Sequence, residues 1–469
     1  MHAVKYLEIF IRLFRKLKNI SHWFLILIAT FSLQLITSTV YASDWYKDYG
    51  LKKSEVFSEK FNSTVTIYQT SNDLFKPSIT LIHGVGGSAE DFKDLVAGLS
   101  LQYKLLLLDL PGFGLSKSHE NIFSPKKYAT LLIDLLPPLI NNTNYIIGHS
   151  MGGNVSVQIA LKAPNLADKL ILIDAAGFLN KFSYSKHIAA NYVNHNIPLA
   201  ERYSSKIKSA ISFLNQLIPD PTKPLLSSVG RETILKNNIN YISAIAVMDE
   251  ELSTLIRKKA PPTLIIWGKK DQVMPYQVSS MLSYLLKTES VFLLPDAGHS
   301  PQKQYPNQII KEINAFIKED NYLAPTKINQ SAQNITINCD NNDSLSILNN
   351  AQFSKVTINN CNQNQVKNLH ATSITLNNSM ITFNHLRVSN IDGYTLLLKN
   401  SDIEIWGGNL NAQTIAYIYN SQLEFNGVEL NATNSLVISN LPTTVNASLT
   451  KVNVKNVVSD WHGFIDVGL

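Results

Sequence analysis

The sequence predicts an α/β domain with a mostly parallel sheet, followed by a C-terminal all-β domain. Three observations support this prediction. Up to about residue 324, apolar runs alternate with amphipathic stretches, which is typical of successive strand–helix–strand units. A stretch over 178–259 interrupts that alternation with a helical pattern and no clear strand. Beyond residue 327, the helical pattern ends and short β-branched runs recur about every 20 residues, which indicates stacked repeats.

The first 42 residues form a separate N-terminal segment. They carry five basic residues against one acidic residue, with an uncharged apolar run over 23–36. Val40, Tyr41 and Ala42 then give the small-residue pattern that a signal peptidase recognises. The run of about 14 residues is short for a membrane-spanning helix, which needs roughly 20. We therefore expect 1–42 to be an export signal and the protein to be periplasmic or secreted in a bacterium. An uncleaved membrane anchor is the alternative.

The composition excludes several classes of protein. The chain has 469 residues, of which 45% are hydrophobic, so it can bury two or three cores and is not globally disordered. Two cysteines exclude a disulfide scaffold and a Cys-rich zinc module. The formal net charge of +6 falls to +2 without the +4 of residues 1–42, so we expect no nucleic-acid partner.

Seven buried apolar runs predict the strands of the α/β region. They lie at 65–68, 78–83, 104–109, 144–148, 169–174, 263–267 and 290–294. Helical patterns lie between them, for example over 125–136 and 307–318. Alternating strands and helices give a parallel sheet, and we expect 178–259 to be a helical insertion between two of its strands.

Asparagine marks the C-terminal repeats. About one residue in five is Asn after residue 327. Six recur at intervals of 22, 18, 22, 20 and 20 residues, namely Asn338, Asn360, Asn378, Asn400, Asn420 and Asn440. Stacked coils share a continuous core, and a recurring Asn can form a ladder of side-chain amides. We expect a right-handed parallel β-solenoid of about six short coils over 325–469, with a β-sandwich carrying Asn-rich turns as the alternative.

The two cysteines fall at the same phase of neighbouring repeats. Stacked strands lie about 4.8 Å apart, which is within the Cα–Cα range of a disulfide. A disulfide between Cys339 and Cys361 suits an exported protein, and two buried free thiols are the alternative.

Three aromatic residues bear on what the repeat domain contacts. Its polar faces offer a surface for a glycan or a membrane. Trp406, Tyr417 and Tyr419 lie in or next to repeat strands, where they form a sugar-stacking row or, as we favour, part of the core.

The strongest motif lies after the apolar run 144–148. The segment GHSMGG (148–153) is a G-x-S-x-G turn between a strand and a helix, which exposes a nucleophilic Ser150 at a helix N-terminus. Gly148 and Gly152 are needed because a side chain at either position would collide with the neighbouring strand or helix. A structural turn serine is the alternative reading of Ser150.

Further motifs follow other strands in a consistent order. HGVGG (83–87) can aim a backbone N–H at a developing oxyanion, and the expected donors are Val85 and Met151. GKKDQVMP (268–275) places Asp271 after a strand, and DAGHSPQ (296–302) does the same for His299. The chain order Ser, Asp, His is that of one serine-triad fold. Asp174 is the alternative acid, and a satisfied loop histidine is the alternative reading of His299.

With DLPGFGLS (109–116), these co-linear motifs make residues of about 55–320 resemble an α/β-hydrolase. The branch they resemble holds small esterases, monoacylglycerol lipases and carbon–carbon bond hydrolases. The resemblance implies that 43–324 is the hydrolase domain and that 178–259 is its cap. Epoxide hydrolases and dehalogenases of this fold carry Asp at the elbow, where this chain has Ser150.

The resemblance and the chemistry together assign roles. Ser150 attacks a carbonyl, His299 moves its proton, and Asp271 orients the imidazole. His83, Gly84 and His149 support the loops. We expect no cofactor and no catalytic metal, since no metal-binding pattern is present.

Three functions stand at this point. We favour an exported serine hydrolase of lipid or other acyl esters. A carbon–carbon bond hydrolase would use the same triad. A surface binding protein would instead act through the repeat domain.

Overall fold

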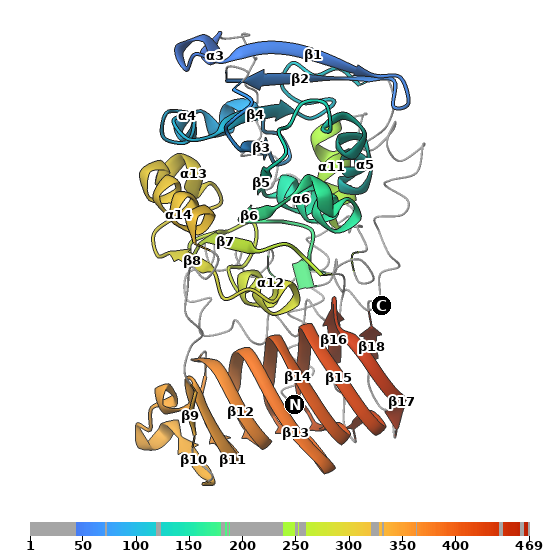
Figure 1. Ribbon diagram of the computed structural model, residues 1–469. Coiled ribbons are helices and arrows are strands. Elements are labelled where there is room, and N and C mark those ends of the chain that lie inside the picture. The colour runs from blue at the N-terminus through green and yellow to red at the C-terminus, as the bar shows by residue number, and fades with distance from the viewer. Residues whose placement is uncertain are drawn as a thin grey trace, which may run out of the picture.

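The computed structural model describes most of the chain (Figure 1). The described residues are 44–70, 73–118, 123–179, 183–184, 187, 238–248, 252, 259–319, 328–330, 333–362, 364–439, 444–459 and 464–467. The expected export signal and most of the expected cap lie outside them. Within these ranges, no helix is both long and apolar enough to cross a membrane.

An eight-stranded sheet forms the first half of the molecule. Its spatial order is β1-β2-β4-β3-β5-β6-β7-β8, and the pairings from β4 to β8 are parallel. The strands are β1 (Lys52–Ser58), β2 (Ser63–Gln69), β3 (Ser78–Ile82), β4 (Lys104–Asp109), β5 (Asn144–His149), β6 (Lys169–Ile173), β7 (Thr263–Gly268) and β8 (Val291–Leu294). The β1–β2 and β2–β4 pairings, at one edge, are antiparallel. This confirms the predicted mostly parallel sheet.

Helices cover both faces of this sheet (Figure 1). One face carries α4 (Lys93–Leu99), α13 (Pro301–Gln304) and α14 (Pro306–Lys318), and the other carries α5 (Pro125–Leu135), α6 (Met151–Lys162) and α11 (Ile239–Met248). Two apolar cores form between the helices and the sheet. The helix α6 is buried along its length up to Leu161, because it lies between the sheet and α5. Two further α-helices of the described residues are α3 (Trp45–Asp48) and α12 (Val278–Leu286).

The sequence prediction missed β1. Four of the seven residues of β1 are exposed and polar or charged, so its apolar pattern is weak. It is an antiparallel edge strand that needs only one neighbour. The prediction of 125–136 and 307–318 as helices is confirmed by α5 and α14, each within one residue at either end.

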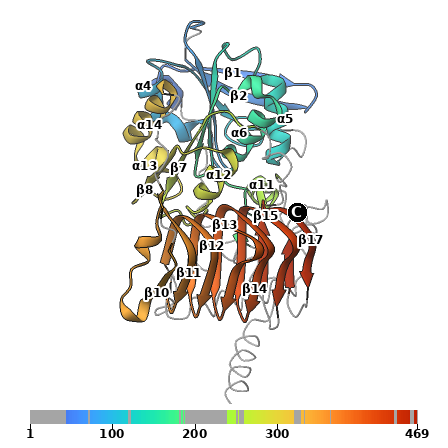
Figure 2. The same ribbon diagram turned by 60° about the horizontal axis from the view of Figure 1, so that its bottom comes forward.

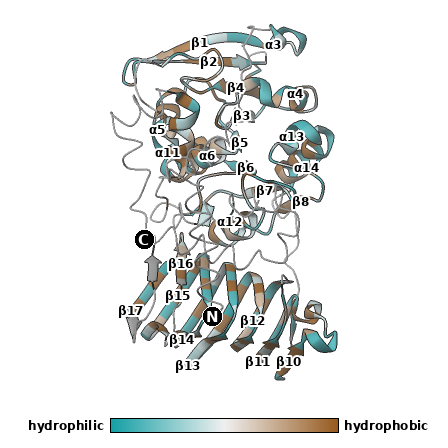
Figure 3. Cartoon of the chain, turned by 180° about the vertical axis from the view of Figure 1, so that it is seen from behind, coloured by the Kyte–Doolittle hydropathy of each residue, from teal (hydrophilic) through white to brown (hydrophobic). Residues whose placement is uncertain are grey.

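The second half is a C-terminal all-β domain, as predicted (Figure 2). Its strands are β9 (Asn329–Gln330), β10 (Ile335–Asn338), β11 (Ala351–Asn359), β12 (Asn364–Asn377), β13 (Met380–Lys399), β14 (Asp402–Tyr419), β15 (Gln422–Ser439), β16 (Thr444–Ser448), β17 (Lys451–Ser459) and β18 (Phe464–Val467). Every pairing among them is parallel. A β-sandwich would pair its strands antiparallel instead. Figure 3 shows apolar and polar residues alternating along these strands, and the inward ones form one core.

The recurring asparagines form a column along one corner of this domain. Asn360, Asn378, Asn400 and Asn420 all have φ between 47° and 55°, a left-handed conformation that Asn tolerates. Their side-chain amides are hydrogen-bonded in series: the Asn400 Nδ2 donates to Asn378 Oδ1 at 3.2 Å, and the Asn420 Nδ2 donates to Asn400 Oδ1 at 2.9 Å. At these four positions the period in the sequence corresponds to one position of the backbone repeat. Asn338 is extended instead, with a φ of −129°, and Asn440 lies outside the described residues.

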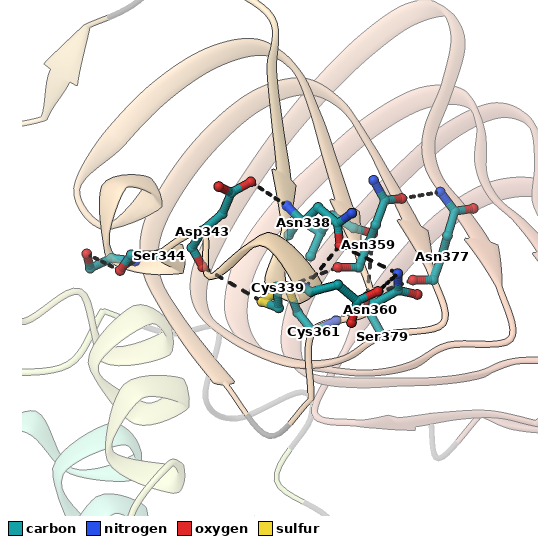
Figure 4. The surroundings of a disulfide bond; sticks show 12 residues. Asn338, Cys339, Asp343, Ser344, Asn359, Asn360, Cys361, Asn377 and Ser379 are labelled. Atoms are coloured by element: carbon teal, nitrogen blue, oxygen red, sulfur yellow. Dashed lines mark hydrogen bonds between the residues drawn. A yellow bond between two sulfur atoms is a disulfide. The ribbon is translucent and has the colours of Figure 1, made fainter.

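A disulfide joins Cys339 to Cys361 at the start of the domain, with 5.1 Å between their Cα atoms (Figure 4). The two residues lie in neighbouring repeats, 22 positions apart. Asn338 and Asn360, just before each cysteine, extend the amide series beside the disulfide. The bond thus fixes the first repeat to the second.

The three aromatic residues Trp406, Tyr417 and Tyr419 differ in how deeply they are buried. Trp406 is 4% exposed, but it packs with the core of the α/β domain rather than with that of its own domain. Tyr417 and Tyr419 are half-buried. Tyr417 also contacts Tyr394 edge-on, with 5.4 Å between the ring centres.

Candidate active site

Ser150 lies in the turn between β5 and α6. It has a φ of 51° and a ψ of −120°, a conformation that a non-glycine residue adopts only when the surroundings impose it. Its N–H donates to Ile173 at 3.0 Å, and its carbonyl receives the N–H groups of Gly153 and Ala176 at 2.9 Å each. These bonds tie the turn to β6 and to α6. They hold the Ser150 hydroxyl above the end of the sheet.

Glycine is required at positions 148 and 152, on both sides of Ser150, because there is no space for a side chain. A Cβ on Gly148 would lie 2.3 Å from the Gly152 carbonyl oxygen, and one on Gly152 would lie 2.0 Å from that of Ile82. A Cβ on Gly84 would lie 2.8 Å from the Cβ of Ser150. The nearest neighbour of Gly148 and of Gly152 is a backbone atom, which cannot move aside. The helix and the HGVGG loop can therefore approach Ser150 only without these side chains.

Ser150, His299 and Asp271 form one chain of hydrogen bonds. The Ser150 Oγ lies 3.0 Å from His299 Nε2, and His299 Nδ1 lies 2.7 Å from Asp271 Oδ2. Because an ionised carboxylate only accepts, the Nδ1 carries the proton and Nε2 is free to receive the one from Ser150. The sequence separations are 149 and 28 residues. The structure thus brings together the three residues that the motifs selected, in the geometry of a nucleophile, a base and an orienting acid.

The loop after β7 holds Asp271. Its Oδ1 accepts the N–H groups of Val273 at 2.7 Å and Met274 at 3.0 Å, and the Asp271 side chain is fully buried. The Trp267 indole N–H donates to the Met274 carbonyl at 3.4 Å from inside the sheet. The carboxylate has one oxygen for the loop and one for His299, so its orientation is fixed.

His83 and His149 both connect loops. The His83 Nδ1 donates to the Gly84 carbonyl at 2.6 Å, and its Nε2 accepts the Leu110 N–H at 3.0 Å. The His149 Nε2 donates to the backbone carbonyl of His299 at 2.6 Å. Burial, with repulsion from His299, lowers the pKa of His149 to about 4, so it is neutral near pH 7. Neither imidazole contacts the Ser150 hydroxyl through a described hydrogen bond.

Asp174, the alternative acid, follows β6 and is fully buried. Its Oδ1 accepts the Gly268 N–H at 2.9 Å, whereas its Oδ2 has no hydrogen-bond partner among the described residues. Burial and then the negative charge of Asp271 hold its pKa well above the usual range. The hydrogen bond to His299 Nδ1 comes from Asp271 instead.

A cavity of about 270 Å³ opens over Ser150 and His299. The expected oxyanion donors Val85 and Met151 both line it. Its apolar wall includes residues of the inserted region and of the loop that holds Asp271, namely Leu179, Tyr184, Val247, Met248, Val273 and Met274. The cavity therefore has an apolar wall beside the hydrogen-bonded polar residues.

The sequence did not single out the ion pair at this cavity. Lys303 Nζ lies 2.6 Å from Asp91 Oδ1, and both residues line the cavity. They are 212 positions apart, so no local pattern could pair them. A Cβ on Gly87 would lie 2.2 Å from Asp91 Oδ2, so the glycine leaves room for this carboxylate.

One group in the described part of the chain has metal-ligand geometry. Ligand atoms of His149, Asp174 and His299 lie within 4.8 Å of one another. Both nitrogens of His299 are already hydrogen-bonded to Asp271 and Ser150. A metal ion at this point would therefore replace one of those contacts.

Comparison with known proteins covers the α/β half of the chain. A model of the α/β hydrolase fold matches residues 77–306. YugF of Bacillus subtilis (strain 168), an uncharacterized hydrolase, is 29% identical over 251 residues, which cover 52% of this chain and 90% of YugF. Lipase 3 of Moraxella sp. (strain TA144) is 28% identical over 256 residues, which cover 53% of this chain and 80% of the lipase. Monoacylglycerol lipase abhd6-B of Xenopus laevis is 27% identical over 257 residues, which cover 52% of this chain and 75% of that lipase.

The family match ends before the all-β domain begins. Within the match lie the parallel strands β3 to β8, the elbow around Ser150 and the loops that carry Asp271 and His299. Through residues 77–306, the chain belongs to the α/β-hydrolase fold family.

Proposed function

We propose that the protein is a serine hydrolase that cleaves carboxylic esters, with lipid or other acyl esters as the substrate class. The observation that carries this proposal is the hydrogen-bonded series Ser150–His299–Asp271, of which Ser150 and His299 line a cavity with an apolar wall. The similarity to Lipase 3 and to monoacylglycerol lipase abhd6-B supports the choice of ester substrates.

The chemistry proceeds through an acyl-enzyme. Ser150 Oγ attacks the ester carbonyl carbon while His299 Nε2 takes its proton, and the N–H groups of Val85 and Met151 stabilise the oxyanion. His299 returns the proton to the departing alkoxide, which leaves as the alcohol. Water then adds to the acyl carbonyl with His299 again as the base, which releases the acid and restores Ser150.

Hydrolysis of p-nitrophenyl butyrate tests this proposal. The wild-type protein turns the ester over, whereas Ser150→Ala lowers kcat by about 10⁴-fold or more while the protein stays folded. Ser156→Ala is a matched control, because Ser156 lies two turns into α6 and its hydroxyl is bonded to the Gly152 carbonyl at 2.7 Å. Equal activity in wild type and Ser150→Ala would remove Ser150 from the mechanism.

The carbon–carbon bond hydrolase would use the same three residues, so substrate choice separates the two activities. If the protein hydrolysed a vinylogous diketone but no acyl ester, carbon–carbon bond hydrolysis would replace ester hydrolysis as the proposed activity.

The location and the domain organisation complete the proposal. Residues 1–42 act as an export signal, 43–324 form the hydrolase domain with a cap at 178–259, and 325–469 form a β-solenoid. The basic, then apolar, N-terminal sequence supports export, and the disulfide suits an oxidising compartment. Parallel pairing at offsets of about 20 residues supports the solenoid. N-terminal sequencing of the protein purified from its native host tests cleavage after Ala42.

A further inference from the structure

The all-β domain has a second column of left-handed residues, at the corner that faces the α/β domain. Its members follow one another in the parallel register: Asn350, Asn368, His385, Gly407, Gly427 and Leu449. Their φ values lie between 47° and 75°. The backbone therefore turns in the same way in every repeat, while the side chain at the turn changes along the column.

That change coincides with α12. Asn350 and Asn368 at one end are joined by their amides at 3.4 Å, as in the other Asn column. Further along, where α12 packs on β13, β14 and β15, the column has His385 on β13 and glycine on β14 and β15 (Figures 1 and 2). A Cβ on Gly407 would lie 2.7 Å from Tyr284 Cβ and 3.2 Å from the Ser280 carbonyl oxygen. Glycine is thus the residue that lets the helix backbone approach.

His385 and Gly427 complete this contact, and with Gly407 we name them the α12 seat. The His385 Nε2 donates to the Ser280 carbonyl at 2.6 Å. A Cβ on Gly427 would lie 2.3 Å from Met281 Cγ. One polar anchor and two missing side chains therefore fix α12 against the all-β domain.

The helix α12 leads directly to the acid of the triad. It begins at Val278, seven residues after Asp271. Between them, Val273 and Met274 donate to the Asp271 carboxylate and line the cavity. The Tyr276 hydroxyl donates to Gln365 Oε1 of β12 at 2.8 Å. The acid loop is thus held at one end by β7 and at the other by the all-β domain.

We propose that the all-β domain is a built-in support for the active site, with Gln365, His385 and Gly407 as positioning residues for the Asp271 loop. The inference rests on the proposed function, in which Asp271 orients His299. It gives the repeat domain a role in catalysis without any contact with substrate. A loop displaced by a fraction of an ångström would misalign His299 and slow the chemical step, while leaving the opposite wall of the cavity in place.

Two full-length variants test this support. Gly407→Asn keeps the left-handed turn, since Asn occupies the same column at Asn350 and Asn368, but its side chain fills the α12 seat. Gln365→Leu removes the acceptor of the Tyr276 hydroxyl. In each folded variant we expect kcat for p-nitrophenyl butyrate to fall about tenfold with KM changed less than about twofold. The rate of Ser150 labelling by a fluorophosphonate should fall by the same factor.

Matched variants separate positioning from a loss of structure. Asn368→Gly changes the same column outside the α12 seat, so it should retain wild-type kcat. Gln365→Glu keeps an acceptor oxygen for Tyr276 and should restore most of the activity that Gln365→Leu loses. Circular dichroism and the thermal midpoint identify the folded variants.

The outcomes also separate this inference from the proposed function. Wild-type kcat and labelling in both folded Gly407→Asn and Gln365→Leu would overturn the support by the all-β domain. A folded wild type that neither hydrolyses esters nor reacts with the fluorophosphonate would overturn the proposed function.

Discussion

Two carboxylates lie close to His299, and their surroundings differ. Asp271 accepts two backbone N–H groups and the imidazole. Asp174 accepts one N–H group, and its second oxygen has no described partner. Burial, and then the negative charge of Asp271, raise the pKa of Asp174 well above the usual range, which favours the neutral form of this carboxyl. The distribution of hydrogen bonds, rather than proximity alone, assigns the acid.

Asparagine substitutions distinguish the two acids by activity. Asp271→Asn should lower kcat for p-nitrophenyl butyrate by up to about 10⁴-fold, because the amide no longer fixes the reactive tautomer of His299. Asp174→Asn should retain kcat within about threefold, because an amide resembles the neutral carboxyl in size and keeps the acceptor for Gly268. If Asp174→Asn lost more kcat than Asp271→Asn, Asp174 rather than Asp271 would be the acid that orients His299.

The pH dependence of stability gives a second test of Asp174. A carboxyl whose pKa is higher in the folded protein contributes stability below its unfolded pKa, which is about 3.9, and loses that contribution as the pH rises through the folded pKa. Asp174→Asn does not titrate. The free energy of unfolding of Asp174→Asn relative to wild type should therefore increase as the pH rises above about 4. A pH-independent difference between the two, measured by urea unfolding from pH 4 to 8, would show an ordinary pKa for Asp174.

At the scale of the element, the Asn400 column shows how one residue type serves two needs. The left-handed backbone requires Gly or Asn, and the amide then links one repeat to the next. Glycine would satisfy the backbone alone. This double requirement explains why the repeats are visible in the sequence as a series of asparagines.

Substitutions at Asn400 separate these two contributions. Asn400→Gly removes two exposed amide hydrogen bonds and should reduce the free energy of unfolding by about 1 kcal/mol. Asn400→Ala removes the same bonds and places a Cβ at a φ of 49°, which should cost about 1 kcal/mol more. Urea unfolding of both variants measures the difference. Equal stability of the two would mean that the backbone conformation contributes nothing.

The elements that the sequence predicted well are those with a local signal. The strand before Ser150 and the motifs around Asp271 and His299 carry their own apolar runs and turn residues. The α12 seat has no such signal, because Gly407 and Gly427 are explained only by a helix more than 120 positions earlier in the chain. The ion pair between Lys303 and Asp91 was not predicted for the same reason. Trp406 was expected near a core, yet nothing local indicated that the core belongs to the other domain.

At the scale of the whole molecule, the two halves share one interface around α12. The helix packs on β7 and β8 of one sheet and on β13, β14 and β15 of the other. Trp406 of β14 extends this interface into the core of the α/β domain. The all-β domain therefore stabilises the fold that carries Ser150, Asp271 and His299.

Trp406 tests this shared interface. Trp406→Ala leaves a large cavity and should reduce the free energy of unfolding by about 3–5 kcal/mol. Trp406→Phe should cost clearly less, because the indole N–H has no described hydrogen-bond partner to lose. In urea, loss of esterase activity and loss of β-structure by circular dichroism should shift together in Trp406→Ala. If Trp406→Ala lost its activity at the same urea concentration as wild type, the stability of the α/β domain would not depend on this contact.

The most direct test of the central claim is to identify the residue that a fluorophosphonate modifies. The folded wild-type protein is treated with the reagent, digested and analysed by peptide mass spectrometry. We expect one adduct per chain, on Ser150, and none in Ser150→Ala. An unmodified Ser150 in the folded protein, or the same adduct in Ser150→Ala, would contradict the assignment of Ser150 as the nucleophile.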